Sequence, residues 1–301
     1  MLTIPRKKKN LITLLSPDIP PIAEVSVGET FAVEAAHHLY MVKEILTHED
    51  IFPVAPKELL NPLTGPIKVR GAEPGDALVI KILDIVCEGE GDVAIMPGGG
   101  LLRSRLKTPK TMIICNDGKR FEIGDGIFVP MKPMIGSIGT TPLEPVISLL
   151  PGPHGGNLDD PNITAGVLVH LPVYVPGANL ALGDVHAAQA DGEGVCPQDI
   201  NALITMRVER IDKQVNIPEV RIETREKWII DKEAGTVEEA LEKSALAMLA
   251  FLQQRTNLTD EQAGFLMTSV GGFHLSQAGM YNYPVICRAE MPKNVDTLGR
   301  L

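Results

Sequence analysis

The segment Met112-Ile-Ile-Cys-Asn-Asp-Gly-Lys-Arg-Phe-Glu-Ile123 determines the fold class that we predict for this chain. It places Asn116, Asp117 and Gly118 between two short apolar runs, and these residue types tolerate the positive φ of a tight hairpin turn. The segment therefore predicts a β-hairpin.

Short β-branched runs separated by turn residues recur on both sides of this hairpin. The chain has 28 glycines and 24 prolines, so we expect short elements and many turns. Four Gly-Glu or Gly-Asp pairs predict turns that lead toward strands, and the fourth is Gly183-Asp184. The predicted strands cover residues 30–35, 77–86, 112–115, 126–129, 167–171 and 203–211.

Only the last third of the chain has a helical pattern. Thr236-Val-Glu-Glu239 and Thr259-Asp-Glu-Gln262 have the form of capping boxes, and apolar residues at helical spacing follow each of them. Gly271-Gly272 ends the second helix. Residues 273–292 alternate again and predict a return to the sheet.

These patterns predict a mostly β fold with β-sandwich or barrel-like layers and a small α/β element that contains the two C-terminal helices. Three regions are expected to pack as one compact unit. They are a β-rich region (1–150), a β-rich region that carries the site (151–230), and a helical hairpin with a closing strand (231–301).

Composition excludes several classes of function. The net charge is -10, from 28 Lys+Arg and 38 Asp+Glu, so nucleic acid is not an expected partner. The longest strongly apolar run, 245–252, is far below the roughly 20 residues that cross a bilayer, and no membrane span is predicted. The four cysteines lack any Cys-x-x-Cys spacing, which favours free thiols and a cytoplasmic protein.

Two histidines lie in segments that strand packing does not explain. His154 is followed by Gly155 and Gly156, and His186 stands near Asp184 in a stretch of small and ionisable residues. In an extended strand, residues i and i+2 face the same way, so Asp184 and His186 can converge on one ion. Imidazole and carboxylate together suit a divalent cation such as zinc, with His154 as a third ligand from another loop.

The alternative for the 183–193 segment is a polar turn with one exposed histidine. The other histidines are weaker candidates. His37 and His38 would point to opposite faces if residues 34–40 were extended, and His170 fits a hydrogen-bonded strand position. Glu34 would face away from Phe31 and Val33, toward solvent or toward a site, and the residues alone favour solvent.

Three blocks of the sequence resemble the acetamidase/formamidase family. They are Gly152-Pro-His-Gly-Gly-Asn-Leu-Asp159, Leu171-Pro-Val-Tyr-Val-Pro-Gly-Ala178 and Gly183-Asp-Val-His-Ala-Ala-Gln-Ala-Asp-Gly-Glu193. Two further regions are similar, 61–76 in the N-terminal part and the pair Ser276-Gln277 with Met291-Pro292-Lys293 near the C-terminus. The resemblance implies a β-rich fold, hydrolysis of short aliphatic amides, a divalent metal near the histidines and a role for Glu34.

The resulting hypothesis is metal-assisted hydrolysis of a small amide to a carboxylate and ammonia. Zinc is the expected ion and calcium the alternative, with His154, Asp184 and His186 as ligands. Glu193, Glu34 or Asp191 would accept the proton of the attacking water. Gly155, Gly156, Asn157 and Gln189 would bind the substrate, the two glycines through their N–H groups.

Two other classes fit the same residues. A cupin-like metal oxygenase would also use His and acidic ligands on a β-sandwich, although it would need a His-x-His pair. A non-catalytic calcium- or carbohydrate-binding β module would explain the Asp and Gly residues without His154. Soluble enzymes are commonly symmetric, and we expect a homodimer.

Overall fold

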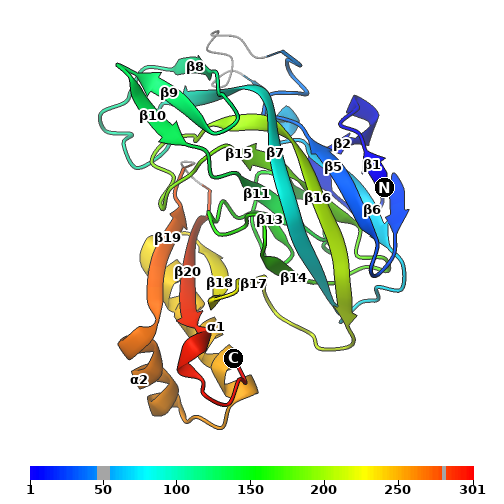
Figure 1. The fold of residues 1–301 in the computed structure, drawn as a ribbon, viewed down its shortest axis with the longest axis vertical. Coiled ribbons are helices and arrows are strands. Elements are labelled where there is room, and N and C mark those ends of the chain that lie inside the picture. Colours follow the sequence, from blue (N-terminus) through cyan, green and yellow to red (C-terminus); the bar gives the residue numbers. More distant parts are fainter. Residues whose placement is uncertain (46–54, 280–282) are drawn as a thin grey trace.

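The computed structural model describes residues 1–45, 55–279 and 283–301 (Figure 1). In these residues sixteen strands form one sheet. Its main path runs in the order β13 (Gly155–Asn157), β11 (Met134–Gly139), β15 (Leu180–His186), β16 (Asp199–Asp212), β7 (Ala77–Ile95), β14 (Leu168–Pro172), β17 (Arg221–Glu223), β18 (Lys227–Ala234), β20 (Val285–Pro292) and β19 (Gly272–Gln277).

Shorter strands branch from this path. They are β1 (Leu2–Ile4), β2 (Leu11–Ile12), β4 (Ala23–Val25), β5 (Thr30–Ala35), β6 (Leu63–Val69) and β8 (Lys110–Ile114). Two separate pairs are formed by β9 (Arg120–Gly124) with β10 (Ile127–Pro130) and by β3 (Leu14–Leu15) with β12 (Val146–Ile147). Single-turn 3-10 helices occupy Lys8–Asn10, Lys57–Leu59 and Lys293–Val295.

The sheet folds over itself around a large core. The long strands β7 and β16 pair along most of their lengths, with three register shifts on β16 that allow the ribbon to bend. In Figure 1 they lie in front of β11, β13 and β15. Strand β15 pairs with β16 at one residue pair, His186 with Asp199. The two layers therefore meet at this pair, while Phe31, Ile80 and Ile204 fill the space between the layers.

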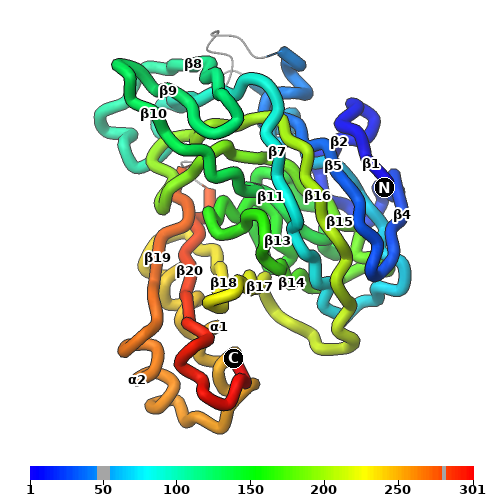
Figure 2. Tube along the Cα trace, viewed as in Figure 1, coloured from blue at the N-terminus to red at the C-terminus, as the bar shows by residue number. Residues whose placement is uncertain are grey.

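The C-terminal element forms a second, smaller core. Helices α1 (Val237–Arg255) and α2 (Asp260–Val270) cover β18 and β20, and Figure 2 places them at the end of the molecule opposite β8–β10. Trp228, Met248 and Phe251 are buried between the strands and α1. Thr236 caps α1 by accepting the Glu239 N–H, and Thr259 begins α2 with a complete capping box.

The predicted fold class, both helices and the closing strands are confirmed. The predicted hairpin is only partly formed. Its turn is present, since Asn116 and Asp117 accept backbone N–H groups of the turn. However, β8 pairs with β7 and β9 pairs with β10, so one bridge, Asn116 with Phe121, joins the two predicted strands.

The predicted turn at Gly183-Asp184 is wrong, because both residues lie inside β15. All seven residues of this strand are buried, and Asp184 adopts a φ of 56° without breaking the register with β11. A left-handed residue inside a buried strand is strained and is typical of functional sites. In the described part of the chain, no helix is long and apolar enough to cross a bilayer.

Candidate active site

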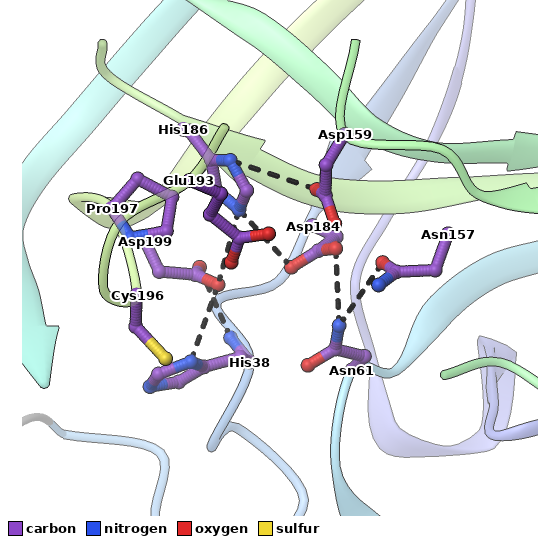
Figure 3. A pocket seen from close by; sticks show the side chains of 10 residues that line it. All are labelled: His38, Asn61, Asn157, Asp159, Asp184, His186, Glu193, Cys196, Pro197 and Asp199. Atoms are coloured by element: carbon purple, nitrogen blue, oxygen red, sulfur yellow. Dashed lines mark hydrogen bonds and ion pairs between the residues drawn. The ribbon is translucent and has the colours of Figure 1, made fainter. Parts of the chain in front are cut away.

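A small cavity of about 30 Å³ lies where β15 meets β16 (Figure 3). Such a volume holds an ion or a water molecule. Ionisable side chains predominate around it, and the carboxylates of Asp184, Glu193 and Asp199 point toward the same space. The lining residues are His38, Asn61, Asn157, Asp159, Asp184, His186, Glu193, Cys196, Pro197 and Asp199.

Asp184 and His186 lie on the same face of β15, as their spacing predicts. His186 Nε2 is 3.4 Å from Asp184 Oδ1. The other carboxylate oxygen of Asp184 accepts hydrogen bonds from Asn61 Nδ2 and Ser137 Oγ, both at 3.0 Å. Burial raises the pKa of Asp184, but His186 outweighs burial and brings the pKa below its usual value. Asp184 is therefore an ionised, oriented carboxylate.

Gln189 fixes the imidazole of His186. Gln189 Nε2 donates to the backbone oxygen of Asp159 at 2.6 Å, so its Oε1 is left to accept from His186 Nδ1 at 2.7 Å. Nδ1 therefore carries a proton, and Nε2 is the nitrogen that faces Asp184. Burial lowers the pKa of His186, but the charges of Asp184 and Asp159 raise it to about 9.

Asp159 completes a group of three ligand-type side chains. One ligand atom each from Asp159, Asp184 and His186 lies within 4.8 Å of the others, and all three residues are buried. Asp159 Oδ1 has no hydrogen-bond partner in the described structure. Burial, followed by the charges of Glu193 and Asp184, raises the pKa of Asp159 well above its usual value. Buried carboxylate oxygens of this kind are satisfied by a cation.

Gly136 on β11 leaves the room that this cluster needs. An ideal Cβ on this residue would lie 2.5 Å from Asp159 Oδ1 and 2.9 Å from Asp184 Oδ2. No side chain larger than hydrogen fits there without moving the carboxylates.

Glu193 forms the wall of the cavity beside this cluster. Burial, and then the charge of Asp184, raise the pKa of its carboxyl to about 8. Gly279 backs this carboxyl so closely that a Cβ there would lie 2.5 Å from the Glu193 carboxyl carbon. Glu193 is thus a carboxyl group that can gain or lose a proton near neutral pH.

The sequence argument did not select six of the residues that line the cavity: His38, Asn61, Asp159, Cys196, Pro197 and Asp199. The argument that His37 and His38 point to opposite faces requires an extended 34–40 segment, but β5 ends at Ala35 and the chain then turns. His38 Nε2 lies 3.2 Å from Asp92 Oδ2, and its Nδ1 lies 3.4 Å from Asp199 Oδ2.

Burial, and then the charges of Asp184 and Asp92, raise the pKa of Asp199 well above its usual value. The signal for Asp159 and Asn61 was present in the sequence, because both stand in blocks that resemble the family.

Several predicted site residues lie away from the cavity. His154 is buried with an unpartnered Nε2, but it lines no part of the cavity, and burial lowers its pKa to about 4. Glu34 accepts the backbone N–H of Arg6 at 3.1 Å. Asp191 is 47% exposed and binds Arg288.

Of the four predicted substrate-binding residues, one lines the cavity and three do not. Asn157 lines the cavity, and its side-chain amide lies 2.7 Å from Ser137 Oγ. Gly155 and Gly156 do not line it: Gly155 donates its N–H to the oxygen of Gly152, and Gly156 pairs with Ile138 in the sheet. Gln189 supports His186 and does not line the cavity.

Comparison with known proteins gives one consistent family. A model of the acetamidase/formamidase family matches residues 4–151 and 148–295. The formamidase of Methylophilus methylotrophus is 28% identical over 236 residues, which are 59% of this chain and 58% of that protein. The acetamidase of Mycolicibacterium smegmatis is 28% identical over 243 residues, 59% of each chain. The chain thus spans about 60% of the length of the curated relatives that it matches.

Solved structures match over nearly the whole chain. An acetamidase from Bacillus halodurans is similar with a TM-score of 0.91 and 34% identity, and 98% of each chain is covered. A predicted acetamidase/formamidase from Thermoanaerobacter tengcongensis has a TM-score of 0.90 and 29% identity, with 98% of this chain and 97% of that chain covered.

Proposed function

Since this chain belongs to the acetamidase/formamidase family, we propose that it hydrolyses short aliphatic amides, such as formamide and acetamide, to a carboxylate and ammonia. The observation that carries the proposal is the buried cluster of Asp159, Asp184 and His186 beside Glu193 in a cavity of about 30 Å³.

The cluster fits a divalent cation. Asp159, Asp184 and His186 would hold it. Asp159 Oδ1 accepts no hydrogen bond from the described residues and lies 3.8 Å from His186 Nδ1, so it is the atom that most needs a cation. Asn61 and Gln189 already orient two of these side chains, as second partners of metal ligands do. Two carboxylates and one imidazole suit zinc, which remains the first choice over calcium. When bound, the ion would polarise the amide carbonyl and lower the pKa of water.

Glu193 is the proposed proton carrier of the reaction. It takes the proton of the attacking water and delivers it to the departing nitrogen, a step that typically contributes about 10²- to 10⁴-fold. Its pKa of about 8 suits both halves of this transfer at neutral pH. Glu34 and Asp191 are less suited, because neither lines the cavity. The Asn157 side chain is the proposed contact for the amide group of the substrate.

Ammonia release from formamide, acetamide and longer amides tests this function, with and without a chelator. Replacing His186 with Ala, or Asp184 with Asn, should abolish both ion retention and ammonia release. Asp212→Asn is the matched control, because it alters a surface carboxylate at the far end of β16. Full turnover after complete removal of divalent ions would refute the role of the cluster.

The same assays separate the alternative classes. Calcium binding without turnover of any amide would favour a binding module, and oxygen uptake with bound iron would favour an oxygenase. A homodimer remains a prediction, which light scattering of the purified protein tests.

A further inference from the structure

The segment that carries Gln189 and Glu193 has no regular secondary structure to hold it. We call residues 189–193 the Glu193 segment. It lies between β15 and β16, and Gly192 and Glu193 both adopt positive φ, at 92° and 44°. A carboxylate on such a segment keeps its place only if other parts of the chain fix the segment.

The C-terminal sheet supplies these contacts. The Gly192 N–H donates to the Ser276 oxygen at 3.1 Å, and the Ala278 N–H donates to the Gly192 oxygen at 3.2 Å. At the side-chain level, Arg288 Nη2 donates to both carboxylate oxygens of Asp191, at 2.9 and 3.0 Å. The Glu193 segment is thus attached to β20 by the ion pair with Arg288. It is attached to β19 by its backbone and by His274, whose Nδ1 lies 3.4 Å from Asp191 Oδ2.

The guanidinium of Arg288 is itself held in place. Its Nη1 donates to Ser276 Oγ at 3.2 Å, and its Nε donates to Glu290 Oε1 at 2.8 Å. The side chain is 5% exposed, and Asp160, which follows the cluster residue Asp159, lies 3.8 Å away. A buried guanidinium with fixed partners presents a rigid pair of donors, and charge-assisted hydrogen bonds are about twice as strong as neutral ones.

We propose that Arg288 is a positioning residue that acts through Asp191 to hold Glu193 against the cavity. This inference rests on the proposed function, because it concerns the placement of the proton carrier. It also gives Asp191 a role: the carboxylate lies on the outer side of the segment, 47% exposed, and faces Arg288. The C-terminal element thereby contributes to the site although none of its strands lines the cavity.

Two variants of Asp191 test the proposal, and a variant of Asp212 serves as the control. Asp191→Ala removes the contacts with Arg288 and His274, whereas Asp191→Asn keeps one acceptor oxygen for them. We expect kcat per bound ion to fall about 100-fold in the alanine variant and about 10-fold in the asparagine variant, with KM changed far less, because a displacement of about 1 Å can cost about 10²-fold. Asp212→Asn, which weakens the ion pair of Arg210, should leave kcat unchanged.

The difference in kcat between the alanine and asparagine variants distinguishes a positioning role of Asp191 from a role as the catalytic base. If Asp191 were itself the base, alanine and asparagine would abolish turnover equally, and the proposal would be wrong. Arg288→Lys supplies an independent check, since lysine keeps the charge but cannot make both bonds to Asp191 together with those to Ser276 and Glu290. It should resemble Asp191→Ala in kcat, while its melting temperature shows whether the fold is retained.

Amide hydrogen exchange provides a readout that does not depend on turnover. The Gly192 and Ala278 amides should exchange faster in Asp191→Ala than in the wild type, whereas the amides of α1 should not change. Unchanged exchange in the Glu193 segment would overturn the proposal even if the protein proved inactive on every amide. Faster exchange in a protein that releases no ammonia would instead contradict only the proposed function.

Discussion

Replacing Gly136 with alanine is expected to disable the carboxylate cluster and to leave the fold in place. The new Cβ would lie 2.5 Å from Asp159 Oδ1, 2.7 Å from the Asp184 backbone oxygen and 2.9 Å from Asp184 Oδ2. Ordinary contact begins near 3.4 Å, so the Asp159 carboxylate must move by about 0.9 Å. The backbone oxygen cannot retreat, because Asp184 lies inside a paired strand.

The magnitudes follow from this displacement. Adding a methyl group to a filled interior costs about 1–3 kcal/mol, which corresponds to a fall in melting temperature of roughly 2–10 °C for a chain of this size. A shift of nearly 1 Å at the reacting groups costs about 10²-fold in kcat/KM. We therefore expect a folded protein with little retained ion and about 1% of the wild-type rate of ammonia release.

Gly264→Ala is the matched control for this experiment. Gly264 lies in α2, and a Cβ there has no atom within 4 Å, so the substitution should raise stability by roughly 0.5–1 kcal/mol and leave turnover unchanged. Thermal unfolding, metal analysis and ammonia release are measured on both variants. Wild-type turnover and ion content in Gly136→Ala would refute the geometry assigned to the cluster.

Three further predictions concern stability. Phe251 is 1% exposed and packs against Trp228 in a tilted arrangement with 5.0 Å between ring centroids. Phe251→Ala should therefore lower the free energy of unfolding by about 3–5 kcal/mol in urea titrations, and a loss below 1 kcal/mol would contradict this packing. Burial raises the pKa of Glu223, but hydrogen bonds from His170 and Lys293 lower it to about 2. The contribution of the ionised Glu223 to stability is therefore complete above about pH 4.5 and is lost as the pH falls through about 2. Glu223→Gln should be less stable than the wild type at pH 7, and this difference in the free energy of unfolding should vanish at the acid end of a pH series. The divalent ion at 100 times its Kd should stabilise the protein by about 2.7 kcal/mol. Calorimetry with and without chelator should show the corresponding rise in melting temperature in the wild type and not in His186→Ala.

Local signals in the sequence were sufficient for the secondary structure of several regions. The Thr259 capping box, for instance, depends on residues three positions apart, so the start of α2 could be read directly. The 112–123 segment was predicted correctly at its turn and incorrectly at its pairing, because the turn is local whereas partner choice depends on β7 and β10, which the segment itself does not specify.

The cluster could be predicted in part. The spacing of Asp184 and His186 places them on one face of a strand, and the structure brings their side chains together. The third member could not be chosen in this way. His154 and Asp159 lie in the same block of sequence, but only the path of the chain around β13 determines that the Asp159 side chain enters the cavity and that His154 does not.

His38 shows a different limit of sequence reasoning. The alternation argument is valid within a strand, and β5 ends two residues before the histidine pair. Its partners Asp92 and Asp199 are distant in sequence and lie on β7 and β16, so no local pattern could have shown the contact.

The attachment of the Glu193 segment to β19 and β20 has a consequence for biosynthesis. The ribosome makes all ten residues around the cavity before it makes Ser276 and Arg288, which come last. A nascent or prematurely terminated polypeptide would therefore possess every cation-binding group without a fixed proton carrier. Catalytic competence would then arise only after translation has passed Arg288.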